Sequence, residues 1–148
     1  MQDATQPPAA PEPGVAERAG EVDRALTVLV VDDEPGVLRA VARILARQGY
    51  RVLSAGDGAE ALHVARAHAG PIALLLTDVV MPGMEGRELA ERFSGAFPGV
   101  PIVFMSGKVA DVALREEIAE GGAGFLSKPF SVEQLVSMVE GAAGRRPA

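Results

Sequence analysis

Five short apolar runs alternate with helical patterns along most of this chain, and this alternation restricts the possible fold more than any other feature. Leu and β-branched residues dominate the runs, which is typical of strands covered on both faces. A strand, a helix and a further strand in succession form a right-handed crossover in a parallel sheet. We therefore expect an α/β fold, a single doubly wound (βα)5 domain. The expected strands are 26–31, 50–54, 71–76, 100–105 and 125–126, and the expected helices begin near Pro35, Asp57, Gly86, Asp111 and Ser131.

The expected domain fills most of the 148-residue chain. Residues 1–24 are rich in Pro, Ala, Glu and Gly and offer few apolar side chains to bury, which predicts a disordered tail or linker. We expect the domain to span residues 25–141, followed by a short C-terminal tail, 142–148. The run at 50–54 is more polar than the others, which favours a place at the edge of the sheet.

Composition excludes several classes of function. The net charge of −6 provides no general basic surface for nucleic acid. The absence of cysteine removes disulfides, thiolate catalysis and zinc–thiolate sites. No apolar run approaches the ~20 residues that span a membrane. We expect a cytoplasmic protein that binds neither membranes nor nucleic acid directly.

Polar residues stand at the carboxyl ends of four expected strands. Asp32 and Asp33 follow the first strand, Asp78 the third, Ser106 the fourth and Lys128 the fifth. Ligands of open α/β sheets bind at this edge, so we expect these five side chains to converge. Carboxylates that share a site repel one another, and a set of oxygen ligands without His or Cys favours Mg²⁺.

The chemistry that suits this set is phosphoryl transfer to a carboxylate. Asp78 can attack phosphorus as a nucleophile and form an acyl phosphate. A bound Mg²⁺ would neutralise the charge that develops, while Lys128 and the hydroxyl of Ser106 can contact phosphoryl oxygens. Taken singly, each acid would be explained as a solvated surface charge, but five complementary residues on one sheet edge favour a site.

The chain resembles the response-regulator receiver domains of two-component signalling over about residues 25–141. The resemblance rests on four segments in order: VVDDE at 30–34, TDVVMPGMEG at 77–86, MSG at 105–107 and FLSKPF at 125–130. The amino-acid sequences of the second and third segments are most similar to those of receivers of hybrid sensor histidine kinases. Lys108 stands where those receivers often have Tyr.

The resemblance implies a flavodoxin-like sheet of order 2-1-3-4-5 and a role for each site residue. Asp78 would accept the phosphoryl group from a phosphohistidine. The cofactor Mg²⁺ would be held by Asp33, Asp78 and the backbone carbonyl of Val80, and by Asp32 mainly through water. Ser106 and Lys128 would hold the phosphoryl group, and Ser106 with Phe125 would form the switch.

The resemblance also implies partners. A sensor histidine kinase or a histidine phosphotransfer protein would supply the phosphoryl group. The sequence leaves no room for an output domain, so we expect a stand-alone regulator that acts on a downstream protein, a phosphate shuttle between a kinase and a phosphotransfer protein, or a receiver cut from a longer hybrid kinase. The bond between Lys128 and Pro129 is expected to be cis, because an X–Pro bond adopts this form at low cost and would aim Lys128 into the site.

Two other functions remain open from sequence. The fold could serve as an interaction module that is never phosphorylated. A Mg²⁺-dependent aspartyl phosphohydrolase of the haloacid-dehalogenase type is a weaker alternative, since those enzymes carry a second Asp two residues after the nucleophile. Val80 occupies that position here. We therefore expect a phosphoacceptor signalling protein rather than an enzyme.

Overall fold

The computed structural model describes residues 25–107 and 112–144, with the backbone alone for residues 112–115. The tail expected at 1–24, residues 145–148 of the tail expected at 142–148, and Lys108 lie outside these residues. The described chain alternates between strand and helix as expected. The elements are β1 (Thr27–Val31), α2 (Pro35–Arg47), β2 (Arg51–Ala55), α3 (Gly58–Ala67), β3 (Leu74–Asp78), α4 (Gly86–Ala96), β4 (Ile102–Ser106), α5 (Val112–Glu120), β5 (Gly124–Ser127) and α6 (Val132–Ala143).

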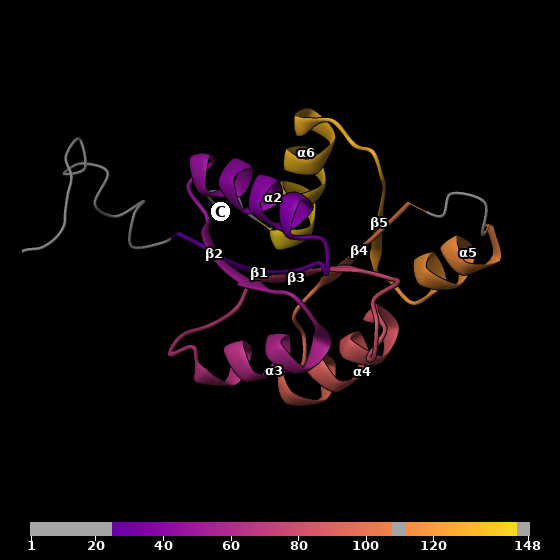
Figure 1. Cartoon of the computed structure of the whole chain (residues 1–148), viewed down its shortest axis with the longest axis horizontal. Coiled ribbons are helices and arrows are strands. Elements are labelled where there is room, and N and C mark those ends of the chain that lie inside the picture. Colours follow the sequence, from indigo (N-terminus) through magenta and orange to yellow (C-terminus); the bar gives the residue numbers. More distant parts are fainter. Residues whose placement is uncertain (1–24, 108–111, 145–148) are drawn as a thin grey trace, which may run out of the picture.

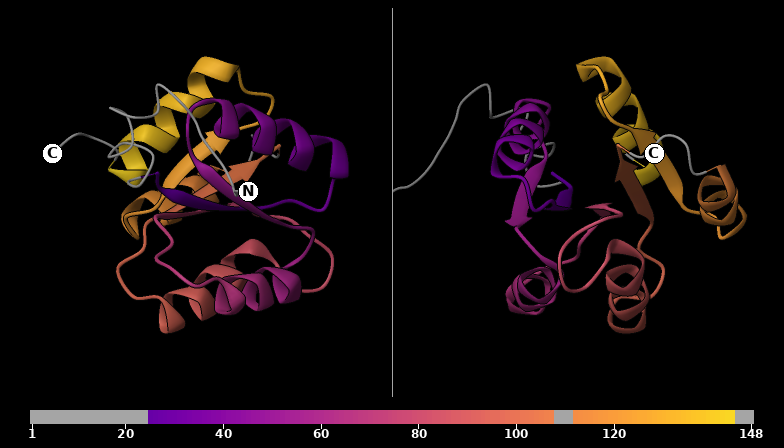
Figure 2. Two further views of the ribbon diagram at one scale, coloured as in Figure 1. Left: turned by 90° about the vertical axis from the view of Figure 1, so that its left-hand side faces the viewer. Right: turned by 45° about the vertical axis from the view of Figure 1, so that its right-hand side comes forward.

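The five strands form one parallel sheet of order β2-β1-β3-β4-β5, which confirms the predicted fold and places β2 at an edge. Helices α2 and α6 cover one face of this sheet, and α3 and α4 cover the other (Figure 1). The turned views show the same three layers, with α5 beside the β5 edge (Figure 2). The carboxyl ends of β1 and β3 lie next to each other at the centre of the sheet.

Alternation along the strands produces a separate core on each face of the sheet. Val28, Val30 and Leu76 pack toward α2 and α6, whereas Leu29 and Leu75 pack toward α3 and α4. All five side chains are fully buried, so β1 and β3 are covered on both faces. Each buried side chain of this size contributes ~1.5–3 kcal/mol from the hydrophobic effect. The central strands therefore hold the residues at their ends on a rigid base.

Local signals in the sequence set the helix ends. Asp57 caps α3 by accepting a hydrogen bond from the backbone of Glu60, at 2.7 Å. The Glu60 carboxylate binds the backbone N–H of Gly56, one residue before the cap. Ser131 and Gln134 form a reciprocal capping box at the start of α6, near the helix start expected from the sequence. Side chains that bind unpaired N–H groups of the first turn fix where each helix begins.

Several element boundaries differ from those expected from the sequence, including the start of β3 and the end of α6. β3 begins at Leu74 rather than at Pro71, although Ala73 N–H already binds the carbonyl of Thr27. α6 continues beyond Gly141 to Ala143, because the left-handed residue that ends it is Gly144, with φ of 69°. Among the described residues, no helix has the length and apolar character needed to cross a membrane.

Candidate functional site

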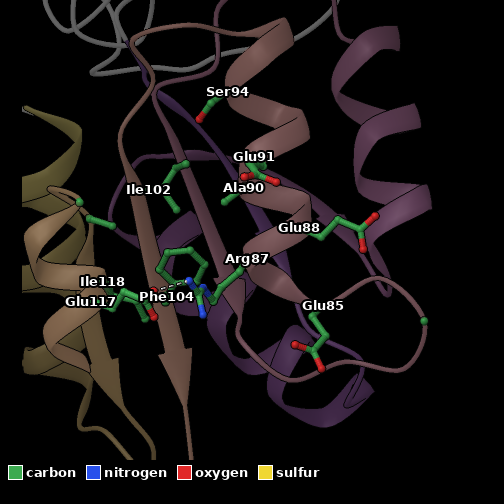
Figure 3. Close-up of a pocket in the computed structure, with 13 residues that line it drawn as sticks. Glu85, Arg87, Glu88, Ala90, Glu91, Ser94, Ile102, Phe104, Glu117 and Ile118 are labelled. Carbon is green, nitrogen blue, oxygen red and sulfur yellow. Dashed lines mark ion pairs between the residues drawn. The ribbon is translucent and has the colours of Figure 1, made fainter. Parts of the chain in front are cut away.

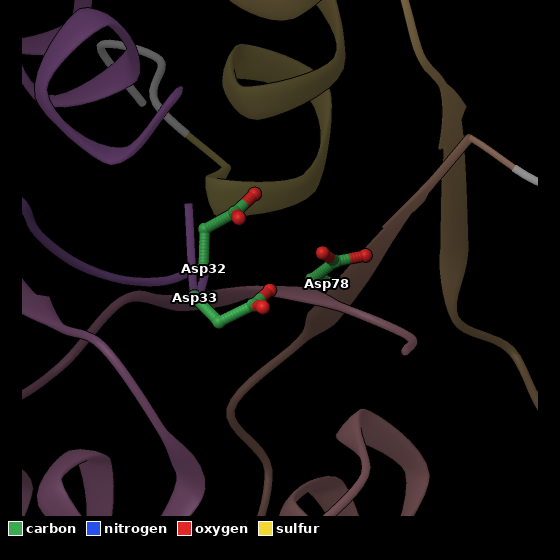
Figure 4. Close-up of side chains that lie close together, drawn as sticks. All are labelled: Asp32, Asp33 and Asp78. Carbon is green, nitrogen blue, oxygen red and sulfur yellow. The ribbon is translucent and has the colours of Figure 1, made fainter. Parts of the chain in front are cut away.

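Three carboxylates meet at the carboxyl ends of β1 and β3. Asp32 and Asp33 follow β1, and Asp78 is the last residue of β3 (Figure 4). One carboxylate oxygen from each residue lies within 4.8 Å of the other two. Asp32 and Asp78 are buried, whereas Asp33 is exposed to solvent. The convergence that the strand pattern predicted is therefore present for all three acids.

Backbone pairing explains why these acids meet. β1 and β3 are parallel neighbours in which Val31 is paired with Thr77, so the residues that follow, Asp32 and Asp78, leave the sheet side by side. The N–H of Asp32 extends the sheet by binding the carbonyl of Ala55 at 3.2 Å. The side chain of Asp32 stabilises the turn after β1, because its Oδ1 accepts a hydrogen bond from the N–H of Glu34 at 2.9 Å.

Lys128 reaches this cluster from the end of β5. Its Nζ lies 2.8 Å from Oδ2 of Asp32 and 3.2 Å from Oδ2 of Asp78. Glu34 adds a third, longer ion pair to the same ammonium, at 3.7 Å. The Lys128–Pro129 peptide bond is cis, as predicted. Sequence analysis had not singled out Glu34, although it stands directly after the acid pair.

The pKa values of Asp78 and Lys128 are both raised. The shift disfavours the charged form of Asp78 and favours the charged form of Lys128. Burial raises the pKa of Asp78, the negative charge of Asp32 raises it further, and the Lys128 ammonium only partly offsets them. Burial by itself would lower the pKa of Lys128. Its hydrogen bond to Asp32 and the charges of Asp78 and Asp32 outweigh that cost, so the pKa is raised. Lys128 is therefore firmly cationic, and the acid cluster is held under electrostatic strain.

The donor set fits a hard divalent cation. Three carboxylates face one ammonium, so the cluster formed by Asp32, Asp33, Asp78 and Lys128 keeps an excess of negative charge. All of its candidate metal ligands are oxygens, the ligands that Mg²⁺ prefers. The exposed carboxylate of Asp33 leaves one side of the cluster open to solvent, which a metal with bound waters requires.

The backbone behind Asp78 is packed against the start of α4. Gly86 N–H binds the carbonyl of Val79 at 2.9 Å. A Cβ atom at Gly86 would clash with the carbonyl oxygen of Asp78 and would lie 3.0 Å from Cα of Val79. Only glycine allows this approach. Sequence analysis had assigned Gly86 no role beyond the helix start, because the contact depends on how α4 returns to the sheet.

The remaining predicted site residues lie around the cluster. Ser106 is buried at the end of β4, whose preceding residue Met105 is paired with Asp78. Phe125 lies on β5 opposite Phe104 and is half-buried against a third, smaller core near α5. Val80 lies two residues after Asp78 in the sequence, and its side chain is 49% exposed.

Comparison with known proteins places this site in a described family. A family model described as the response regulator receiver domain matches residues 28–140. The sensor kinase CckA of Brucella abortus (strain 2308) is 35% identical over 133 residues, which are 90% of this chain and 14% of that protein. The response regulator receiver protein CpdR of the same strain is 36% identical over 113 residues, covering 76% of this chain and 92% of that protein.

A solved structure agrees with these relatives. The receiver domain of the hybrid histidine kinase CckA is 38% identical and superposes with a TM-score of 0.67. The match covers 79% of this chain and 98% of the solved chain. The present chain thus corresponds to a small part of the kinase and to nearly the whole of the receiver protein.

Proposed function

Because this chain belongs to the response regulator receiver family, we propose that it accepts a phosphoryl group from a phosphohistidine on Asp78. One observation carries the proposal. Asp78 ends the central strand β3, with the acids that follow β1 on one side and the ammonium of Lys128 3.2 Å from its Oδ2. Asp32 also contacts this ammonium, at 2.8 Å, but its other oxygen accepts the N–H of Glu34 and so stabilises the turn after β1.

The reaction is a displacement at phosphorus. An oxygen of the Asp78 carboxylate forms a bond to phosphorus, and the bond between phosphorus and the donor's imidazole nitrogen breaks with its electron pair on that nitrogen. Lys128, now bound to Asp78 and Asp32, can move its ammonium onto a phosphoryl oxygen because its Nζ already lies beside the reacting carboxylate. Ser106 would donate its hydroxyl to a second phosphoryl oxygen.

Mg²⁺ is the cofactor that this donor set suits. Asp33, Asp78 and the carbonyl of Val80 would hold it, with Asp32 acting mainly through water. When bound, it supplies positive charge against the phosphoryl oxygens. Asp32 has a separate function in this scheme, because its contacts to Lys128 and to the Glu34 N–H position the ammonium and the turn after β1.

An apolar groove beside the site suits the partner that would deliver the phosphoryl group. The groove has a volume of about 520 Å³, lies between α2 and the start of α6, and includes Lys128 in its wall. Val37 and Ile44 of α2 face Phe130 and Val132 across it. Val132 is 50% exposed, so it adds accessible apolar surface to the partly buried side chains of the groove. We assign this groove to the histidine-bearing helix of a kinase or phosphotransfer protein.

The acyl phosphate would be read through Ser106 and Phe125. Ser106 ends β4, and Phe125 lies on the neighbouring strand against the small core beneath α5. A hydroxyl drawn toward the phosphoryl group would leave space that the ring can enter, and α5 would shift with it. A downstream protein that contacts this side would sense the change.

Intact mass after treatment with acetyl phosphate and Mg²⁺ tests the proposal. We expect one phosphoryl group on the wild type and none on Asp78→Asn. The matched control is Asp57→Asn, which changes another strand-to-helix loop acid outside the cluster. Phosphorylation of Asp78→Asn at the wild-type rate would refute the assignment. Absence of phosphate on the wild type with both acetyl phosphate and a set of histidine kinases would favour an interaction module that is not phosphorylated.

A further inference from the structure

A second groove, away from the acid cluster, opens between α4 and α5 over strand β4 (Figure 3). It has a volume of about 790 Å³, within the range of sites that bind small ligands or several side chains. Its walls come from the two helices, and β4 forms its floor. None of the five predicted site residues that converge at the strand ends lines it, so it is a separate site from the acid cluster.

The floor of the groove is apolar. Ile102 and Phe104 of β4 lie between Ala90 of α4 and Ile118 of α5. Among the side chains that the structure describes, Ala90, Phe104 and Ile118 belong to a small buried cluster, and Ile102 packs against it. Ile102 remains only partly buried. Ile102 therefore keeps some apolar surface in the groove, and an apolar side chain from outside can add to this cluster.

The rim of the groove is acidic. Four carboxylates and one guanidinium line it. Glu88 is turned outward and paired with Arg92 at 2.9 Å, and Glu117 is paired with Arg87 at 3.1 Å (Figure 3). Within the part of the chain that the structure describes, Glu85 and Glu91 have no basic partner. They lie on the same wall six positions apart, roughly 9 Å along a helix at ~1.5 Å per residue.

The ion pair between Arg87 and Glu117 crosses the groove but closes it weakly. Both side chains are about half exposed, at 49% and 59%. Exposed ion pairs of this kind contribute little to stability, because water and salt screen them. A second cation could replace Arg87 on Glu117 at little cost. The pair is thus no obstacle to a basic partner, and Arg87 is the groove's only repulsive charge among its described lining residues.

We propose that this groove binds a short basic segment of a partner protein, with an apolar side chain between its cations. The apolar side chain would rest on Phe104 and Ile118, and the Lys or Arg side chains would pair with Glu85, Glu91 and Glu117. Charge complementarity selects this occupant, since an acidic segment would meet three carboxylates. A purely apolar segment would leave Glu85 and Glu91 without partners.

Fluorescence anisotropy with the full chain tests the proposal. The probe is a short labelled peptide of Lys, Leu and Ala, compared with one in which Ser replaces Leu and one in which Glu replaces Lys. We expect the first peptide alone to bind measurably. Glu91→Arg should weaken binding about fivefold to tenfold, since an attraction becomes a repulsion at an exposed site. Ser94→Trp, at an exposed lining position, should also weaken it by filling the groove.

The matched control is Glu140→Arg, which makes the same change of charge at an exposed position on α6, outside the groove. We expect it to leave the affinity unchanged within error. Equal weakening by Glu140→Arg, or equal binding of the Ser-containing peptide, would reduce the effect to general charge attraction and overturn the proposal. Complete competition by spermidine at peptide-like concentration would do the same, because it would show a site for small cations. Circular dichroism spectra of the variants establish that they fold.

Discussion

Gly86, the first residue of α4, packs against the carbonyl group of Asp78 so closely that no Cβ atom fits between them. The contact ties the backbone of the proposed acceptor to the helix that follows its loop. The hydrogen bond from Gly86 N–H to the Val79 carbonyl, 2.9 Å long, reinforces it. The position of Asp78 thus depends on a residue that has no side chain.

Gly86→Ala should therefore lower stability and misplace Asp78. Overpacking against rigid backbone typically costs ~1–3 kcal/mol. Urea unfolding would measure the free energy of unfolding, and the rate of labelling by acetyl phosphate would show whether Asp78 has been displaced. Gly95→Ala is a matched control in the same helix, since nothing lies within 4 Å of a Cβ there. It should instead raise stability by ~0.5–1 kcal/mol, from its better helix propensity. Equal effects of the two variants would show that the close approach is unimportant.

Asp78→Asn should stabilise the metal-free protein at neutral pH. The pKa of Asp78 is raised above the ordinary value of 3.8, chiefly by burial, so the folded state binds the proton more tightly than the unfolded state. The stability linked to this group is fully present below about pH 3.8 and is lost as pH rises through the folded-state pKa. Asn carries no charge, so the variant does not lose this stability as pH rises. We expect its free energy of unfolding at neutral pH to exceed that of the wild type by on the order of 1 kcal/mol.

Urea unfolding across pH in the presence of a chelator checks this. The difference in stability between Asp78→Asn and the wild type should grow as pH rises from acid to neutral. Glu140→Gln, at an exposed position on α6, should show no such trend. A difference that is constant with pH would contradict electrostatic strain at Asp78.

Mg²⁺ should stabilise the folded protein through the acid cluster. A ligand that binds only the folded state at ten times its dissociation constant adds ~1.4 kcal/mol. Asp33→Asn should abolish most of this gain with little effect on the metal-free protein, because Asp33 is exposed. Thermal unfolding with and without Mg²⁺ measures both quantities. Glu133→Gln serves as the control, and a full Mg²⁺ response in Asp33→Asn would remove Asp33 from the ligand set.

Val132→Asp should separate the two kinds of phosphoryl donor. The substitution places a charge in the apolar groove beside Lys128, at a side chain that is 50% exposed and so contributes little to folding. Transfer from a phosphorylated kinase or phosphotransfer protein should slow by about tenfold or more, the effect of losing an interface anchor. Labelling by acetyl phosphate should not change. If both donors slow equally, the groove is not a docking surface.

The acyl phosphate should be long-lived. Hydrolysis needs a water held in line with phosphorus, and positioning supplies most of the catalysis available. Val80, two residues after Asp78, is 49% exposed beside the site but cannot hydrogen-bond a water. Val80→Asn should speed loss of phosphate by about tenfold, because the amide can hydrogen-bond a water and hold it in line with phosphorus. An unchanged rate, measured by intact mass over time, would show that this side chain does not control the water.

The sequence alone determined the sheet and the membership of the acid cluster. Runs such as 26–31 and 71–76 are mostly apolar on both sides of the strand, so they had to be covered on both faces, and parallel strands bring their carboxyl ends to one edge. Asp32, Asp33 and Asp78 could therefore be placed together before any coordinates. Local capping by Asp57 and Ser131 was equally visible, because each cap depends only on residues three positions apart.

Tertiary structure decided which partners these residues meet. Lys128 lies 96 positions from Asp32, and its preference for that carboxylate over Asp78 depends on where β5 ends relative to β1. The clash that requires glycine at position 86 depends on the return of α4 to the sheet. The acidic groove is lined by residues of α4, β4 and α5, which come together only through the packing of these elements. Hydrophobic periodicity and secondary-structure propensity act over a few neighbouring residues, whereas these contacts depend on how whole helices and strands pack against one another.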